Sequence, residues 1–180
     1  MPAGPQGRLW LRDDLPQYIP ESRIFLYEYN STAVYGKDRS TFIDKANMLL
    51  EEIRLERRET GKRPILFLGH SVGGLLIKQA LINAHNSANS KYSSIKDATT
   101  GLAFFATPHH GASSMKVTFG DILAKIATGL GVQQGDNIVE ILKNEGIFSD
   151  ITHEQWRHRL PNYGVISFWG AYDSVSRLAM

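Results

Sequence analysis

The sequence contains no cysteine, which excludes disulfide bonds, thiolate metal sites and cysteine nucleophiles. Long hydrophobic runs are also missing, because the longest ones, 65–68 and 102–106, are far shorter than the ~20 residues of a membrane-spanning helix. The first ten residues carry no apolar stretch that could act as a secretory signal. We therefore expect an intracellular protein with no transmembrane segment.

An excess of one sign of charge is missing too. The chain has 20 basic and 18 acidic residues, a formal net charge of +2. This balance predicts neither a nucleic-acid groove nor a polybasic membrane arm. Hydrophobic residues make up 42% and charged residues 21%, which is typical of a globular protein. With 180 residues and no internal repeat, we predict a single domain over 1–180.

Apolar segments of strand and helix type alternate along the chain. Four short segments predict strands, at 23–29, 64–68, 101–106 and 165–169. Apolar residues at helical spacing predict helices at 41–58, 75–84, 122–130, 138–142 and 154–160. Parallel strands need a crossover, and right-handed crossovers place helices outside the sheet. The alternation therefore predicts an α/β fold, a mostly parallel sheet with helices on both faces.

One short motif carries chemistry, the G-x-S-x-G pattern of residues 69–73, which has Ser71 at its centre. The pattern follows a predicted buried strand and opens a predicted helix. This is the context in which a serine is held on a sharp turn with its hydroxyl at the carboxyl edge of a sheet. The amide of Val72, at the start of the helix, could then donate to a developing oxyanion. The alternative is a glycine-rich turn in which the serine has no chemical role.

Two other kinds of site are not expected. Gly69 and Gly74 have the spacing of a phosphate-binding loop, but Leu75 and Leu76 stand where such a loop needs lysine and serine or threonine. The two histidines at 153 and 158 are five residues apart and do not share a helix face, so they do not predict a metal pair. We expect no metal and no cofactor.

Several motifs together resemble the serine esterases of the α/β-hydrolase superfamily. More closely, the chain is similar to the serine-active-site-containing protein group and to hydrolase-like domains of fungal NACHT-type multidomain proteins. The resemblance rests on residues 10–16, 23–24, Tyr27, Tyr29, 69–75, 78–80 and 107–111, and it extends to about Trp169. It implies an α/β-hydrolase fold that is truncated at both ends in this chain. It also implies an association with mitochondrial or endoplasmic reticulum membranes.

The resemblance assigns roles to residues around the motif. It implies that Ser71 is the nucleophile, in an elbow formed with Gly69, His70, Gly73 and Gly74. The Val72 amide would be half of the oxyanion hole. The second half should come from a His-Gly loop upstream of Trp10, and the nine residues before Trp10 contain no such motif. The His70 side chain should point away from the serine hydroxyl and make a structural hydrogen bond.

The acid and the base of the triad are harder to assign. The order in this superfamily is serine, acid, histidine. Asp173 follows the last predicted strand and is our candidate for the acid, although it could be an ordinary loop aspartate. No histidine follows His158, so the expected base is missing. His109 follows the strand at 101–106 and is an alternative base, although it could only shape the loop beside the site.

The predicted function is acyl transfer from a small-molecule or lipid ester or thioester through Ser71. The segment 112–160 could form a helical cap over the site or a plain helical cover for the sheet. The alternative function is a catalytically impaired hydrolase-like module that acts in protein interaction or signalling, in a larger multidomain context. A chain without the base and without one oxyanion donor would accelerate the reaction by about 10³-fold or less over the rate in water.

Overall fold

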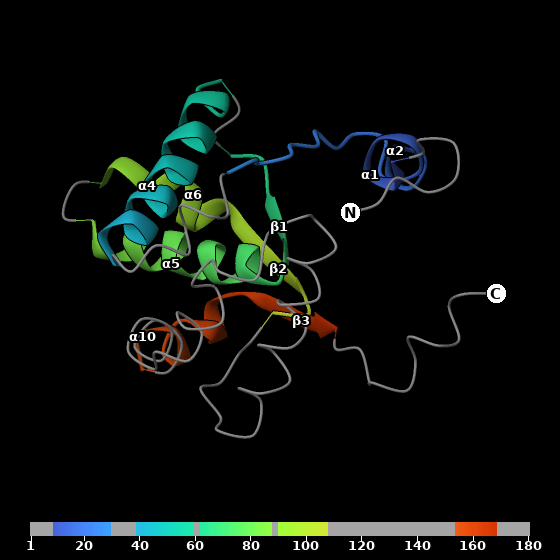
Figure 1. Cartoon of the computed structure of the whole chain (residues 1–180). Helices are drawn as coiled ribbons and strands as arrows, with labels where there is room; N and C mark the ends of the chain where they lie inside the picture. Colours follow the sequence, from blue (N-terminus) through green and yellow to red (C-terminus); the bar gives the residue numbers. More distant parts are fainter. Residues whose placement is uncertain (1–8, 30–38, 60–61, 88–89, 108–153, 169–180) are drawn as a thin grey trace, which may run out of the picture.

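The computed structural model describes residues 9–29, 39–59, 62–87, 90–107 and 154–168. Two short helices come first, α1 (Trp10–Asp13) and α2 (Leu15–Tyr18). The elements that follow are α4 (Arg39–Glu56), β1 (Ile65–His70), α5 (Val72–Asn86), η1 (Ser90–Tyr92), α6 (Ser93–Ala98), β2 (Thr99–Phe105), α10 (Glu154–Arg157), η2 (Leu160–Asn162) and β3 (Gly164–Phe168). Figure 1 shows α1 and α2 set apart from the helices that gather around α5.

The three strands form one parallel sheet in the order β1-β2-β3. The last residue of β1, His70, lies opposite Phe105 of β2, and Phe105 lies opposite Phe168 of β3. All three strands therefore end at the same edge of the sheet. Helices flank this sheet (Figure 1), which confirms the predicted α/β fold class. The predicted helices 122–130 and 138–142 lie outside the described residues.

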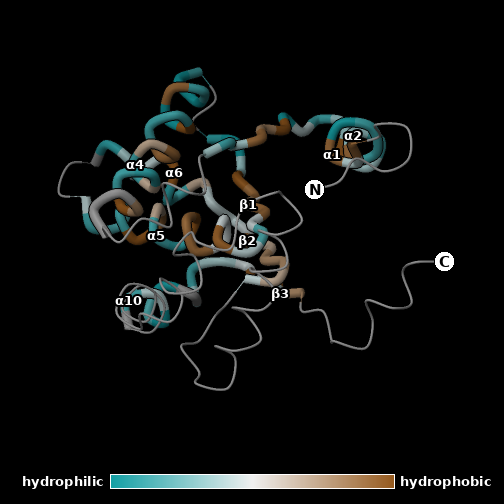
Figure 2. The backbone as a smooth tube through the Cα atoms, in the orientation of Figure 1, coloured by the Kyte–Doolittle hydropathy of each residue, from teal (hydrophilic) through white to brown (hydrophobic). Residues whose placement is uncertain are grey.

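Helix α5 is the centre of the core. It packs against β1 on one side and contacts α4, α6 and α10 on the others. Eleven of its residues are buried, because apolar side chains occur on most of its faces. Figure 2 shows the same pattern as hydrophobic colour along both α5 and β1. The residue that follows β1 therefore lies at the start of the helix that forms the centre of the core.

One buried residue of α5 is charged. Lys78 has no exposed surface, and its Nζ lies 5.2 Å from the ring centre of Phe104 and 6.0 Å from that of Trp156. Burial lowers the pKa of Lys78 from 10.5 to about 8. Below that pH the folded protein has to hold an ammonium group inside its core.

The strand predicted at 23–29 is wrong. The segment has no regular secondary structure and joins no sheet among the described residues. Its attachment is through side chains instead, because Tyr27 and Tyr29 pack against the core while Phe25 and Leu26 are 58% and 60% exposed. Alternating apolar residues favour an extended chain, but a strand also needs a neighbour to accept its backbone hydrogen bonds.

Candidate active site

The G-x-S-x-G motif forms the predicted turn between strand and helix. β1 ends at His70, α5 begins at Val72, and Ser71 between them has φ 52° and ψ −125°. A positive φ is uncommon for a residue with a side chain and is strained outside the left-handed helical region. Such strain costs about 1–3 kcal/mol, and the surrounding packing has to hold it.

Two glycines let the chain approach itself closely at this turn. A Cβ on Gly69 would lie 2.6 Å from the Cα of Gly74. A Cβ on Gly74 would lie 2.5 Å from Cγ2 of Thr107 and closer still to its Oγ1. Gly73 is different, because the nearest atom to a Cβ there is the hydroxyl oxygen of Tyr29 at 3.6 Å, an ordinary contact. The elbow therefore needs Gly69 and Gly74 for space.

The side chain of Ser71 is in an unusual state. The residue is 8% exposed, and within the described part of the chain its Oγ is buried with no hydrogen-bond partner. Leaving a buried hydroxyl unpaired costs about 1–3 kcal/mol. The backbone of the same residue is well bonded, since its N–H donates to the carbonyl of Phe105 at 2.9 Å. The backbone of the turn is thus held by a hydrogen bond, while the Ser71 hydroxyl forms none with the described residues.

Helix α5 directs a partial positive charge at this position. The first N–H groups of a helix, here those of Val72 and Gly73, have no carbonyl one turn earlier to bond with. The N–H of Gly74 donates back to the carbonyl of Ser71 at 3.1 Å, which closes the first turn. An anionic oxygen beside Ser71 would therefore meet both free N–H groups and the positive end of the helix dipole.

Backbone hydrogen bonds join the three strand ends around Ser71. Ala106, directly after β2, has φ 48°, and its N–H donates to the carbonyl of Phe168 at 2.9 Å. The rings of Phe105 and Phe168 stack with their centres 4.8 Å apart. The next residue, Thr107, is 1% exposed. Ligands in parallel sheets lie outside the carboxyl ends of the strands, which is the edge where these residues and Ser71 meet.

Thr107 and Tyr29 lie beside the turn, and the sequence alone assigns neither of them a role there. Thr107 fills the space that Gly74 leaves, and the hydroxyl of Tyr29 lies over Gly73. Their motifs contributed to the family resemblance, and the alternation Tyr27-Glu28-Tyr29 indicates that the two tyrosines share a side of an extended chain. That alternation was the available signal, although it does not say what the tyrosines face.

The other predicted site residues have different outcomes. His70 is exposed and makes no hydrogen bond among the described residues, so the structural hydrogen bond expected of it stays a prediction. As the last residue of β1, it has a side chain on the exposed face of the strand, like Leu66 and Leu68. Asp173 and His109 both lie outside the described residues, so the proposed acid and base stay predictions.

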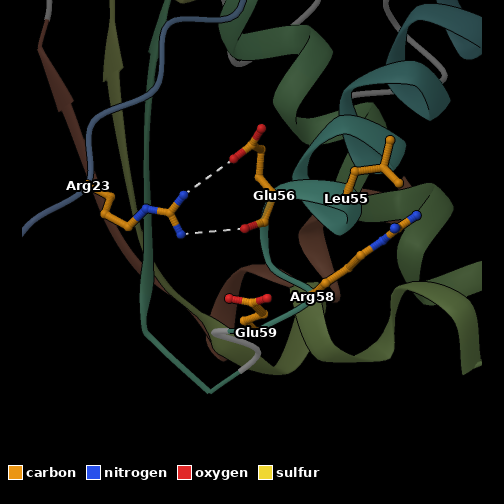
Figure 3. Close-up of a pocket in the computed structure, with 5 residues that line it drawn as sticks. All are labelled: Arg23, Leu55, Glu56, Arg58 and Glu59. Carbon is orange, nitrogen blue, oxygen red and sulfur yellow. Dashed lines mark hydrogen bonds and ion pairs between the residues drawn. The ribbon is translucent and has the colours of Figure 1, made fainter.

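A surface cavity of about 230 Å³ lies away from this site (Figure 3). It is lined by Arg23, Leu55, Glu56, Arg58 and Glu59. Its lining comes from the end of α4, from two residues that follow this helix and from Arg23. Arg23 donates to both the backbone carbonyl and the carboxylate of Glu56. None of these five residues belongs to the serine turn.

The described residues contain no group of three or more histidine, aspartate or glutamate side chains placed to hold a metal ion. Among them there is also no helix with the length and apolar character needed to cross a membrane.

Comparison with known proteins finds relatives for part of the chain. No family model matches the sequence, and no solved structure matches it significantly. Protein SERAC1 of Homo sapiens is 32% identical over 108 residues, that of Bos taurus 32% over 108 residues, and that of Danio rerio 31% over 105 residues. Each match covers 57% of this chain but only 15–16% of the relative. The chain is homologous to Protein SERAC1 over the matched part. For that part, the homology confirms the resemblance to the serine-active-site-containing group.

Proposed function

We propose that this chain is a lipase/esterase-like serine hydrolase that transfers the acyl group of an ester or thioester through Ser71. The observation that supports this is the state of Ser71. Its backbone is strained, its buried hydroxyl has no partner in the described chain, and it precedes the first turn of α5. Backbone strain and an unpaired buried hydroxyl both lower the stability of the fold, so they are expected together at a site that serves a function.

In the proposed reaction, Oγ of Ser71 forms a bond to the acyl carbon of the substrate. The hydroxyl proton passes to a base and then to the alcohol or thiol, which leaves as its bond to the acyl carbon breaks. In the second half water bonds to the acyl carbon and gives a proton to the base, the bond from the acyl carbon to Oγ breaks, and Oγ takes that proton back as the acid leaves. The carbonyl oxygen becomes anionic in both halves, and the Val72 N–H donates to it at the positive end of α5.

The acid and the base of this reaction are proposals from the sequence. A serine hydroxyl is a weak nucleophile without a base. We propose Asp173 as the acid and His109 as the candidate base. In the chain, Asp173 comes five residues after Phe168 at the end of β3, and His109 comes four residues after Phe105 at the end of β2. Both strands end at the edge of the sheet where Ser71 lies.

The domain organisation is a proposal as well. We propose one domain over 1–180, with 112–160 either a cap over Ser71 or a cover for the sheet. One described part of this segment favours the cover, because α10 contacts α5 and Trp156 is 2% exposed in the core. The chain spans 16% of the length of Protein SERAC1, so a larger multidomain context is part of the proposal. A lipid ester at a mitochondrial or endoplasmic reticulum membrane is the substrate that the resemblance favours.

A second candidate is a non-catalytic hydrolase-like module that binds a protein partner. The observation that favours it concerns Ser71 itself, because no described side chain bonds to its Oγ and could act as the base. An elbow without a base keeps its shape and loses most of its activity.

Labelling with a fluorophosphonate probe tests the two candidates. We expect the folded wild-type chain to be labelled and Ser71→Ala to lose the label. Ser94→Ala is the matched control, because Ser94 is an exposed serine of α6, and it should keep the label. Asp173→Asn and His109→Ala in the same assay identify the acid and the base by slower labelling. A folded wild type that takes no label would refute the hydrolase and support the binding module.

A further inference from the structure

Tyr29 and Thr107 both reach the serine turn from outside the motif, and Tyr29 lies over the start of α5. The hydroxyl oxygen of Tyr29 is 3.6 Å from the place where a Cβ on Gly73 would lie. Gly73 is in the first turn of α5, two residues after Ser71. This places a tyrosine hydroxyl over the same helix end that presents the free N–H groups.

The ring of Tyr29 is held in place while its hydroxyl has no described partner. The ring is partly buried against the core and stacks on Tyr27, with ring centres 5.9 Å apart. Tyr27 is anchored in turn, because its hydroxyl donates to the carbonyl of Lys45 on α4 at 3.3 Å. No hydrogen bond of the Tyr29 hydroxyl occurs in the part of the chain that the structure describes. Tyr29 thus offers a positioned donor that this part of the fold does not use.

Burial keeps this hydroxyl protonated. It raises the pKa of Tyr29 above its ordinary value of 10, and the neighbouring Tyr27 adds to the effect. A phenol that keeps its proton through the neutral range can donate a hydrogen bond but cannot act as a base there. The chemistry of the residue therefore fits an electrophilic role, stabilisation of negative charge, rather than activation of Ser71.

We propose that the Tyr29 hydroxyl donates the second hydrogen bond to the substrate carbonyl oxygen when Ser71 attacks it. The inference rests on the proposed function. The first donor is the Val72 N–H, and two donors that converge on one oxygen stabilise its developing charge far better than one. The phenol keeps its proton throughout, so the bonds that form and break remain those at Ser71 and the acyl carbon. Donors of this kind are often long in the free enzyme and shorten as the substrate binds.

The test compares Tyr29→Phe with Tyr92→Phe in the full chain, using p-nitrophenyl butyrate as the substrate. Both changes remove one hydroxyl and keep the ring, but the hydroxyl of Tyr29 lies over the serine turn while that of Tyr92 bonds Glu51. Loss of a donor used in the transition state should lower kcat about 100-fold in Tyr29→Phe with little change in KM. Tyr92→Phe should keep kcat within about threefold of wild type. The rate of labelling by the fluorophosphonate should follow kcat in both variants.

A site-specific 3,5-difluorotyrosine at position 29 gives a readout that a structural role would not affect. A donor that loses its proton in alkali can no longer stabilise the oxyanion, so kcat should fall at high pH. The fluorinated residue keeps the ring and loses its proton at lower pH, so this fall of kcat should begin at lower pH. The proposal is wrong if Tyr29→Phe keeps kcat within threefold of wild type or changes KM alone. That result, with wild type labelled at Ser71, leaves the hydrolase proposal standing. A folded wild type that shows neither labelling nor hydrolysis overturns both proposals.

Discussion

Replacing Gly74 with alanine tests the packing of the serine turn. The added Cβ would meet three atoms of Thr107, with Cβ at 2.9 Å, Cγ2 at 2.5 Å and Oγ1 closer still. Carbon atoms in contact normally lie about 3.5–4.0 Å apart. Thr107 cannot retreat easily, because it is 1% exposed and its β-branched side chain is stiff. We therefore expect Gly74→Ala to destabilise the fold.

The magnitude follows from two opposing effects. Overpacking of a filled site costs about 1–3 kcal/mol, while alanine in place of glycine within a helix gains about 1 kcal/mol. Gly73→Ala is the matched control, since it makes the same change one residue earlier and meets only the Tyr29 hydroxyl at 3.6 Å. Gly73→Ala should stabilise the protein by up to about 1 kcal/mol. The gain from alanine is common to both variants, so they should differ by the overpacking cost of about 1–3 kcal/mol, or roughly 2–12 °C in Tm for a chain of this size.

Thermal and urea unfolding of the two variants measure this difference. The double variant Gly74→Ala with Thr107→Ala removes the two nearest atoms and should be more stable than the sum of the single changes predicts. The reasoning is refuted if Gly74→Ala is as stable as Gly73→Ala, or if truncation of Thr107 gives no relief. Either result would mean that α5 does not approach Thr107 as closely as the structure shows.

Two further predictions concern pH. The pKa of Lys78 is about 8 when folded and 10.5 when exposed, so the unfolded chain holds the extra proton between these values. The free energy of unfolding should therefore rise with pH from about 8 towards 10, by up to about 3 kcal/mol, and Lys78→Met should flatten that rise in urea unfolding from pH 7.5 to 9.5. Arg54 and Lys91 lower the pKa of Glu51 from 4.5 to about 2, so stability should fall as the pH drops from 4.5 to 2, and less so in Glu51→Gln. The assignment of Lys78 would be contradicted if the free energy of unfolding of Lys78→Met rose with pH as steeply as that of wild type. The assignment of Glu51 would be contradicted if Glu51→Gln lost as much stability in acid as wild type.

The local pattern predicted the elements that place the candidate nucleophile. The apolar run at 64–68 and the glycines around Ser71 led to a strand, a turn and a helix, and the structure has β1, Ser71 and α5 in that order. These predictions succeeded because hydrophobic periodicity and the shape of glycine act over a few neighbouring residues. The parallel order of the sheet followed too, since the crossover helices leave few other topologies.

Predictions that depended on distant partners failed or stayed open. The segment 23–29 has the composition of a strand, but no described strand pairs with it. His70 faces the exposed side of β1 and forms no hydrogen bond with the described residues, so the bond expected of it stays open. A side chain acquires such a partner only when another part of the chain comes beside it.

The sequence by itself determined the strained serine turn, because the G-x-S-x-G spacing between an apolar strand and an apolar helix leaves the backbone little other choice. Only the tertiary structure decided what surrounds that turn. It brought Thr107 against Gly74, from 33 residues away, and Tyr29 over Gly73, from 44 residues away. Such contacts come from the packing of α5 between β1 and α4, and no pattern of neighbouring residues encodes them.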